Sequence, residues 1–324
     1  MNLKAFYLSS GVYVPSRTLS LISLLFDKVY MLTLDPLSAD IALRRGYELS
    51  DESKAAIKEM SKTVERFLQE TEPLRQEGVL AVMPFDEVKI KNSKLRRIIK
   101  LRSRYESFLP ISEVKLNISD VVKEWPIFSP PESEDEIRPN GNFRDEVLVR
   151  FRYLSPLIIA QGVEAEMIAD EPTPVTYLRS MIYRRRRSSS GRKNRLMAEI
   201  PELRMNRPSD LLKARGEYKA ELDELREMLK GFTDEIRSKE IPSIEKAPRN
   251  LRRDLKRMAK LLRKITHKIE SDPNISATIG KRKISPVMSV ELFPYLSFRR
   301  FALGSSETEE RNSFVLQLDF NPRR

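Results

Sequence analysis

The sequence predicts an α/β N-terminal domain with a largely parallel sheet, followed by a basic, helix-rich C-terminal part that contains a long antiparallel helical hairpin. In the first half of the chain, short apolar runs alternate with amphipathic segments, and this alternation is typical of crossover units between parallel strands. In the second half, two long amphipathic segments are joined by a short connection. That pattern indicates a pair of antiparallel helices.

Charge also divides the chain into two unlike parts. Residues 1–178 carry 24 Lys and Arg against 27 Asp and Glu, whereas residues 179–324 carry 35 against 20. We therefore expect two domains with these bounds, the first near-neutral and the second strongly basic. An excess of cations on one part indicates a partner with dense negative charge, nucleic acid first and an anionic membrane surface second.

The first elements are each marked by apolar spacing and by the residues that end them. Residues 3–8 form a short apolar run that predicts a buried strand. A helix is expected over residues 16–26, with Ser16 as its cap. Residues 29–34 are β-branched and aromatic enough to form a second strand, which ends at Asp35.

A longer helix and further strands complete the predicted sheet. The helix spans residues 51–72, with its apolar residues on one face. Residues 79–83 predict a third strand and residues 163–168 a last strand of the N-terminal domain. Residues 314–320 alternate in polarity, and we expect them to form a strand that rejoins the N-terminal sheet.

The predicted hairpin, residues 209–270, is the main element of the basic part. We expect Ser209 and Asp210 to cap its first helix, which runs to residue 239. The second helix is predicted over residues 249–269, after a connection flanked by prolines.

The second hairpin helix is a candidate surface for a polyanion. It has nine cations and one acid between residues 249 and 268, with the apolar residues in a separate stripe. Such a face can line a phosphate backbone and gains affinity from counterion release. The nucleic-acid contacts predicted here are Arg252, Arg253, Lys256, Arg257 and Lys260. The alternative is a solvated face whose cations pair with acids near the first helix. The acids spaced for that role are Glu217, Glu221, Glu224, Glu227 and Glu235.

An arginine-rich tract precedes the hairpin. Eight cations fall between residues 179 and 195, in a stretch with serines and a glycine that we expect to be partly flexible. Arginine binds phosphate through two parallel hydrogen bonds, so the tract predicts further nucleic-acid contacts. These are Arg184, Arg185, Arg186, Arg187, Arg192 and Lys193. The alternative is a disordered linker that favours solubility.

Three aspartates after predicted strands leave an enzyme as a further alternative. Asp35, Asp86 and Asp170 follow the second, third and last strands of the N-terminal domain. The carboxyl ends of parallel strands share one edge of a sheet, where such acids could hold Mg²⁺ for phosphodiester hydrolysis. However, aspartate is also an ordinary turn residue, and the first strand supplies no acid. We therefore expect no metal and no cofactor, and these three residues are catalytic candidates only for a nuclease.

Composition excludes several classes of function. The chain has no cysteine and one histidine, His267, so disulfides, thiolate metal sites and cysteine nucleophiles are excluded and a histidine-based metal site has no second ligand. The sequence contains no phosphate-binding glycine loop and no hydrolase motif. The longest apolar run, residues 19–34, is too short to span a bilayer. We expect a cytoplasmic protein without a membrane partner.

Short apolar stretches carry a resemblance to other proteins. Phe6-Tyr7-Leu8, the run from Leu24 to Tyr30, and later Tyr153-Leu154-Ser155-Pro156-Leu157 are similar to stretches in various uncharacterised bacterial proteins with an α/β N-terminal domain. The resemblance implies a prokaryotic source and an α/β start. It transfers no activity and no site residue.

The function expected from these observations is sequence-nonspecific nucleic-acid binding, DNA or RNA, by a component of a larger assembly. One alternative is a structural or protein-interaction subunit that uses the hairpin as a docking arm for a protein partner. The other is a metal-dependent nuclease. A binding protein is expected in preference to an enzyme.

Overall fold

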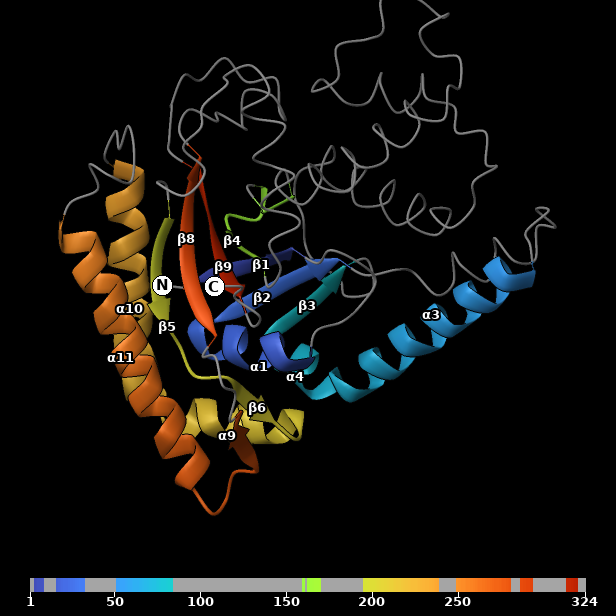
Figure 1. The fold of residues 1–324 in the computed structure, drawn as a ribbon. Helices are drawn as coiled ribbons and strands as arrows, with labels where there is room; N and C mark the ends of the chain where they lie inside the picture. Colours follow the sequence, from blue (N-terminus) through green and yellow to red (C-terminus); the bar gives the residue numbers. More distant parts are fainter. Residues whose placement is uncertain are drawn as a thin grey trace, which may run out of the picture.

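The structure, a computed structural model, describes residues 3–8, 16–32, 51–83, 159–160, 162–169, 195–238, 249–280, 286–293 and 313–319. These segments form a seven-stranded sheet, a separate two-stranded sheet, and helices that pack against them (Figure 1). The strands are β1 (Lys4–Leu8), β2 (Lys28–Leu32), β3 (Leu80–Met83), β4 (Glu166–Ala169), β5 (Arg195–Glu199), β6 (Leu203–Met205), β7 (Ala277–Ile279), β8 (Val287–Phe293) and β9 (Ser313–Asp319). The helices are α1 (Ser16–Leu25), α3 (Asp51–Glu70), α4 (Glu72–Gln76), α9 (Pro208–Glu217), α10 (Lys219–Ser238) and α11 (Arg249–Ser271).

The four N-terminal strands form a parallel sheet, as the sequence predicts. β1 lies between β2 and β4, and β3 pairs with the other side of β2. Apolar residues dominate these strands and are buried on both faces of the sheet, for example Phe6 and Ala5 in β1. Burial on both faces is the usual condition of parallel strands.

Strands from the C-terminal part extend the same sheet. β9 pairs with β4 in parallel, which confirms that the final predicted strand rejoins the N-terminal sheet. β8 then pairs with β9, and β5 with β8, both antiparallel. The strand order is β3-β2-β1-β4-β9-β8-β5, so the pairings from β3 to β9 are parallel and those beyond β9 are antiparallel. The predicted domain boundary near residue 178 lies outside the described residues.

Two helices that the sequence predicts as continuous are each divided into two in the structure. The helix expected over residues 51–72 ends at Glu70, and α4 begins after Thr71 with Pro73 in its first turn, where the missing N–H of proline costs no helical hydrogen bond. The helix expected over residues 209–239 is divided at Tyr218 into α9 and α10.

The predicted cap of the first hairpin helix, expected from residue 209, is also wrong. α9 begins at Pro208, and its N-cap residue, Arg207, makes no capping hydrogen bond through its side chain. Proline favours the first helical position because its φ is already fixed near the helical value. Ser209 and Asp210 therefore lie inside the first turn and do not cap it.

Four strands in the basic part, β5, β6, β7 and β8, were not predicted. β5 begins at Arg195, so the expectation that Arg195 belongs to a partly flexible stretch is wrong. β6 and β7 pair with each other in a two-stranded antiparallel sheet. These two strands are only three residues long, which leaves too little alternation for a sequence pattern to register.

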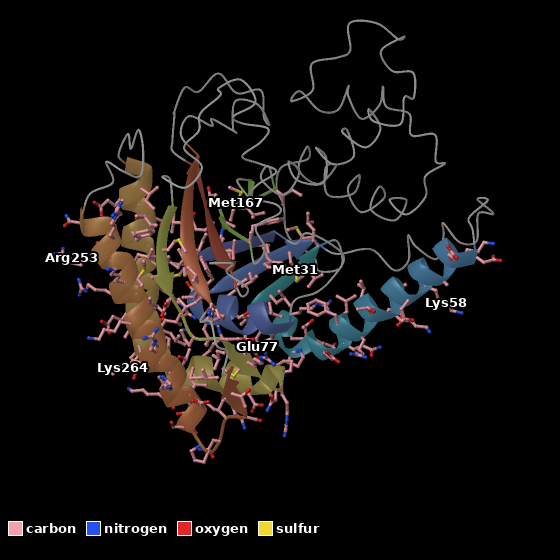
Figure 2. The ribbon with its side chains drawn as sticks, in the orientation of Figure 1. Met31, Lys58, Glu77, Met167, Arg253 and Lys264 are labelled. Carbon is pink, nitrogen blue, oxygen red and sulfur yellow. The ribbon has the colours of Figure 1, made fainter. Side chains whose placement is uncertain are left out.

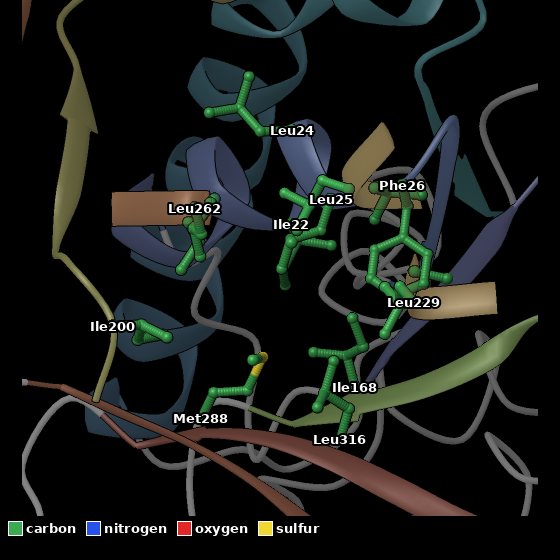
Figure 3. Close-up of a cluster of buried hydrophobic side chains, with 14 of the residues drawn as sticks. Ile22, Leu24, Leu25, Phe26, Ile168, Ile200, Leu229, Leu262, Met288 and Leu316 are labelled. Atoms are coloured by element: carbon green, nitrogen blue, oxygen red, sulfur yellow. The ribbon is translucent and has the colours of Figure 1, made fainter. Parts of the chain in front are cut away.

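One apolar core joins the sheet to the helices. It includes Ile168 of β4, Leu316 of β9 and Met288 of β8, packed with Ile22 of α1 and Leu262 of α11 (Figure 3). Along each strand the residues in this core alternate with residues on the opposite face, as side chains in a pleated strand do. Among the described residues, no helix is long and apolar enough to cross a membrane.

Candidate nucleic-acid interface

α11 is an amphipathic helix whose two faces differ completely in chemistry. Six of its apolar residues recur at steps of three or four and are at most 2% exposed, so they pack side by side on one face of the helix. These residues are Leu251, Leu255, Met258, Leu262, Ile265 and Ile269. They pack in the common core, and α11 contacts both α10 and β5. Core packing therefore determines which side of α11 faces solvent.

The exposed side of α11 carries a dense row of cations, which we call the α11 cationic strip. It consists of Arg252, Arg253, Lys256, Arg257, Lys260, Arg263, Lys264 and Lys268, all of them exposed. At about 100° per residue these positions cover an arc of about 160° around the helix. Figure 2 shows Arg253 and Lys264 pointing away from the body of the molecule.

Most of these cations are unpaired within the described residues. Lys268 Nζ lies 2.7 Å from Glu221 Oε1, and Arg253 Nε lies 3.9 Å from the carboxylate of its neighbour Asp254. For the other six strip residues, the part of the chain that the structure describes provides no ion pair. The expected contacts Arg252, Lys256, Arg257 and Lys260 are among these six.

The predicted pairing between α11 and acids near the first hairpin helix is realised at Glu221. The hydrogen bond from Lys268 lowers the pKa of the Glu221 carboxyl, and the nearby charge of Lys264 adds to this effect. Glu217, Glu224 and Glu227 are exposed and make no ion pair with described residues. Neutralisation by these acids therefore accounts for a small part of the strip.

The first turn of α11 has the least favourable charge of the helix. No acid occupies it, although acids stabilise the positive end of the helix dipole and cations destabilise it. Arg252 lies at the end of this turn and Arg253 follows it. The arrangement is thus costly to the free protein and suited to an anionic partner.

α3 provides an internal comparison, because it also exposes a row of cations. Lys54, Lys62 and Arg66 pair with acids of the same helix at 3.1, 3.9 and 3.3 Å. Such pairs at three- and four-residue spacing stabilise a helix without any partner. α3 projects from the other side of the molecule (Figure 1), and its exposed cations are largely neutralised where those of α11 are not.

Two arginines, the buried Arg226 of α10 and the half-buried Arg215 of α9, hold their helices against the end of α1. Arg226 Nη1 lies 3.1 Å from Asp27 Oδ1 and 3.2 Å from Asp223 Oδ1. Arg215 of α9 donates to the carbonyl oxygens of Ser23, Phe26 and Asp27 at the end of α1. Burial lowers the pKa of Arg215 to about 10, and the charge of Arg226 contributes to the shift.

The other predicted site residues lie outside the described part of the chain. This holds for Arg184 to Arg187, for Arg192 and Lys193, and for Asp35, Asp86 and Asp170. The strand ends that precede the aspartates are level with one another: Leu32 is paired with Met83, and Leu8 with Ala169. β1 separates β2 from β4. Among the described residues there is no cluster of three or more side chains that could hold a metal ion.

The candidate contacts predicted from sequence omitted part of the strip. Arg263 and Lys264 lie three and four residues after Lys260 and continue the same exposed face, a spacing that could have identified them. The structural role of Arg226 was also missed. Its signal is a cation between Leu225 and Leu229, on the apolar side of α10.

No protein-family model matches the chain, and no curated protein and no solved structure shows significant similarity to it. The prokaryotic source implied by the resemblance therefore stays an expectation, and the function rests on the geometry of the chain itself.

Proposed function

We propose that this protein binds nucleic acid without sequence preference, through the α11 cationic strip, as a component of a larger assembly. The observation that supports this most is the set of six exposed cations without an ion pair among the described residues. Lysine and arginine on one face supply the phosphate contacts on which nonspecific affinity depends. They do not supply base recognition, because base recognition requires side chains that reach base edges in a groove.

The energetics of the strip favour an anionic partner over a bare solvated surface. Cations four residues apart on one helix repel each other, and Arg252, Lys256, Lys260, Lys264 and Lys268 form such a series. A phosphate backbone would remove that repulsion and release its own bound counterions. The free energy of binding would therefore include a favourable contribution from each molecule: less repulsion in the protein and counterion release from the nucleic acid.

We propose that the arginine tract is a second nucleic-acid contact, next to the α11 cationic strip. Lys193 stands two residues before β5 begins, and β5 packs against α11. The chain therefore leads from the tract directly to the strand beside the strip. We propose that the tract and the strip contact one nucleic-acid molecule.

We further propose that α10 and α11 form the two arms of the expected antiparallel hairpin. Tyr218, just before α10, donates from its hydroxyl to Asp272 Oδ2, just after α11, at 3.0 Å. Lys268 near the end of α11 contacts Glu221 near the start of α10. These contacts support helices of opposite direction. Their connection, residues 239–248, lies outside the described residues.

The proposal is tested by equilibrium binding of a mixed-sequence nucleic acid at two salt concentrations. Fluorescence anisotropy with a labelled duplex should show binding at about 50 mM salt that weakens steeply by about 200 mM. Removing four strip cations, in Arg252→Gln/Lys256→Gln/Lys260→Gln/Lys264→Gln, should make the slope of log K against log salt shallower by about 3 to 4.

A matched control removes the same charge from α3. The variant Lys54→Gln/Lys58→Gln/Lys62→Gln/Arg66→Gln also changes four exposed cations at four-residue spacing on a long helix. It should leave the salt slope unchanged. Equal effects of the two variants would show that only net charge matters and contradict the assignment to α11. No binding by the folded protein at low salt, to duplex or to single strand, would contradict the proposed function and favour the protein-docking alternative.

A further inference from the structure

We infer that the α11 cationic strip recognises the two phosphate backbones of a double helix and not a single strand. This inference rests on the proposed function and specifies the form of nucleic acid that the site accepts. It follows from three properties of the described residues: the width of the strip, the fixed backbone beneath it, and the absence among them of an exposed Phe, Tyr or Trp side chain.

The strip is wide enough to contact two strands. At about 100° per residue, Arg252 and Arg263 lie near one margin of the exposed face, and Arg257 and Lys268 lie about 120–160° away at the other. A helix with side chains is about 10–12 Å across, which is close to the roughly 12 Å width of the B-DNA major groove. The two margins of α11 therefore face the two backbones that border a groove.

The strip is also held in a fixed geometry. Buried residues recur along the whole of α11, from Leu251 to Ile269, so core packing fixes the helix over the length of the strip. From Arg252 to Lys268 the helix rises about 24 Å, which corresponds to about seven base pairs of a duplex. The fixed helix backbone needs no ordering when it binds a rigid duplex, whereas a flexible single strand must itself be ordered on binding.

Single-strand binding requires chemistry that this surface lacks. Proteins that hold single strands stack bases on aromatic side chains, and α11 contains no Phe, Tyr or Trp. Every described Phe and Tyr side chain with an assigned exposure is buried, apart from the half-buried Tyr218. The imidazole of His267 is exposed on the strip, and its Nδ1 lies 3.6 Å from Glu270 Oε2. The hydroxyl of Tyr218 is hydrogen-bonded to Asp272. The described surface thus provides phosphate contacts without a stacking platform of Phe, Tyr or Trp.

A membrane surface is a poorer match to the same helix. An amphipathic helix that binds a bilayer inserts its apolar face among the lipids. The apolar face of α11 is already buried in the protein core. Only its cationic side is available to a partner, which favours the charge-only contact that a double helix offers.

The test compares a DNA duplex, an RNA duplex and a single strand of about 20 nucleotides or base pairs under one salt condition, with affinity expressed per phosphate. We expect the DNA duplex to bind more than about threefold tighter than the single strand, and tighter than the RNA duplex. Comparison of the two duplexes shows whether the protein prefers double-stranded DNA or double-stranded RNA. The fit to the major groove favours DNA, since the A-form major groove of RNA is too deep and narrow for side chains to enter.

Two double variants test both margins of the strip. Arg252→Gln/Arg263→Gln and Arg257→Gln/Lys264→Gln should each weaken duplex binding, while Lys58→Gln/Lys62→Gln on α3 should leave it unchanged. A duplex-to-single-strand ratio of about three or less, with binding still lost in the α11 variants, would overturn the inference and leave the proposed function standing. Loss of duplex binding from one margin alone would also overturn it, as would stronger binding to vesicles of anionic lipid than to the duplex. Absence of all nucleic-acid binding would instead overturn the proposed function.

Discussion

Arg226 and Asp27 form an ion pair that fixes α10 to the connection between α1 and β2. The Arg226 side chain is 10% exposed, and its Nη1 lies 3.1 Å from Asp27 Oδ1. Asp27 also accepts a hydrogen bond from the backbone N–H of Leu3 at 2.7 Å. One carboxylate therefore links the start of β1, the end of α1 and the middle of α10.

We expect Asp27→Ala to destabilise the protein much more than Asp223→Ala. Both substitutions remove one carboxylate partner of Arg226, but only the first also removes the acceptor of the Leu3 N–H. Loss of Asp27 should cost about 3 kcal/mol of unfolding free energy because a buried cation loses its main partner. Loss of the more exposed Asp223 should cost about 1 kcal/mol or less. Urea denaturation measures both, and equal losses would contradict the linking role of Asp27.

Two glycines should respond in opposite directions to alanine. Gly231 lies within α10 with open space around its missing Cβ, so Gly231→Ala should stabilise the protein by about 0.5–1 kcal/mol through lower backbone entropy. A Cβ on Gly280 would lie 2.6 Å from Glu202 Oε2, and Glu202 is buried and bound to Arg204. Gly280→Ala should cost about 1–3 kcal/mol. Thermal denaturation of the two variants measures both changes in stability. A higher melting temperature for Gly280→Ala would contradict the packing around Glu202.

The contact between Glu221 and Lys268 should contribute to stability in a pH-dependent way. Because the hydrogen bond from Lys268 lowers the pKa of Glu221 below 4.5, the folded state favours the ionised carboxyl. The stabilisation is present above pH 4.5 and is lost as the pH falls through the lowered pKa. Glu221→Gln should therefore lower the melting temperature at neutral pH, and by less at an acidic pH below the lowered pKa. The same loss at both pH values would show that the charge of Glu221 is not the cause.

Removing strip cations should make the free protein slightly more stable. Arg252→Gln/Lys256→Gln/Lys260→Gln/Lys264→Gln eliminates four like-charge neighbours at four-residue spacing, each unfavourable by about 0.2–0.5 kcal/mol. The melting temperature of this variant should rise at low salt and converge on that of the original protein as salt screens the repulsion. A marked fall would indicate that these cations have structural partners.

The arginine tract can be tested independently of the strip. Changing Arg184, Arg185, Arg186 and Arg187 to Ala should weaken nucleic-acid binding for every sequence alike and make its salt dependence shallower. The melting temperature should stay nearly unchanged. A large fall in melting temperature would show that the arginines serve the fold.

The N-terminal elements were predictable because their signals are local. Val29 to Leu32 and Leu80 to Met83 are short apolar runs with clear ends, and α11 has regular apolar spacing over its whole length. β5 was missed because Arg195 continues a cationic stretch and because Met197, on the outer face of the strand, is apolar yet 51% exposed. Its register against β8 depends on partners about ninety residues later in the chain, which no local pattern contains.

The same reasoning applies to the candidate site. The cations of α11 and their common face follow from spacing alone. Whether acids neutralise them depends on the rotation of α10 against α11, which is fixed by buried residues such as Leu225 and Leu229. That rotation leaves Glu224 and Glu227 exposed while Glu221 reaches Lys268. Helix-helix packing is a tertiary property, so the sequence left the alternatives open.

The place of β9 between β4 and β8 has a consequence for how the chain folds on the ribosome. β4 is synthesised well before β9, and at about 5–20 residues per second the interval between Ala169 and Ser313 lasts roughly 7–30 s. During that time the nascent chain can pair β1 to β4, but β4 keeps an open edge of the kind that invites wrong partners. In ribosome-stalled chains, all strands of the sheet should resist protease digestion only after β9 has emerged from the ribosome. Translation speed over the second half of the message thus determines how long this protein is exposed to misassembly.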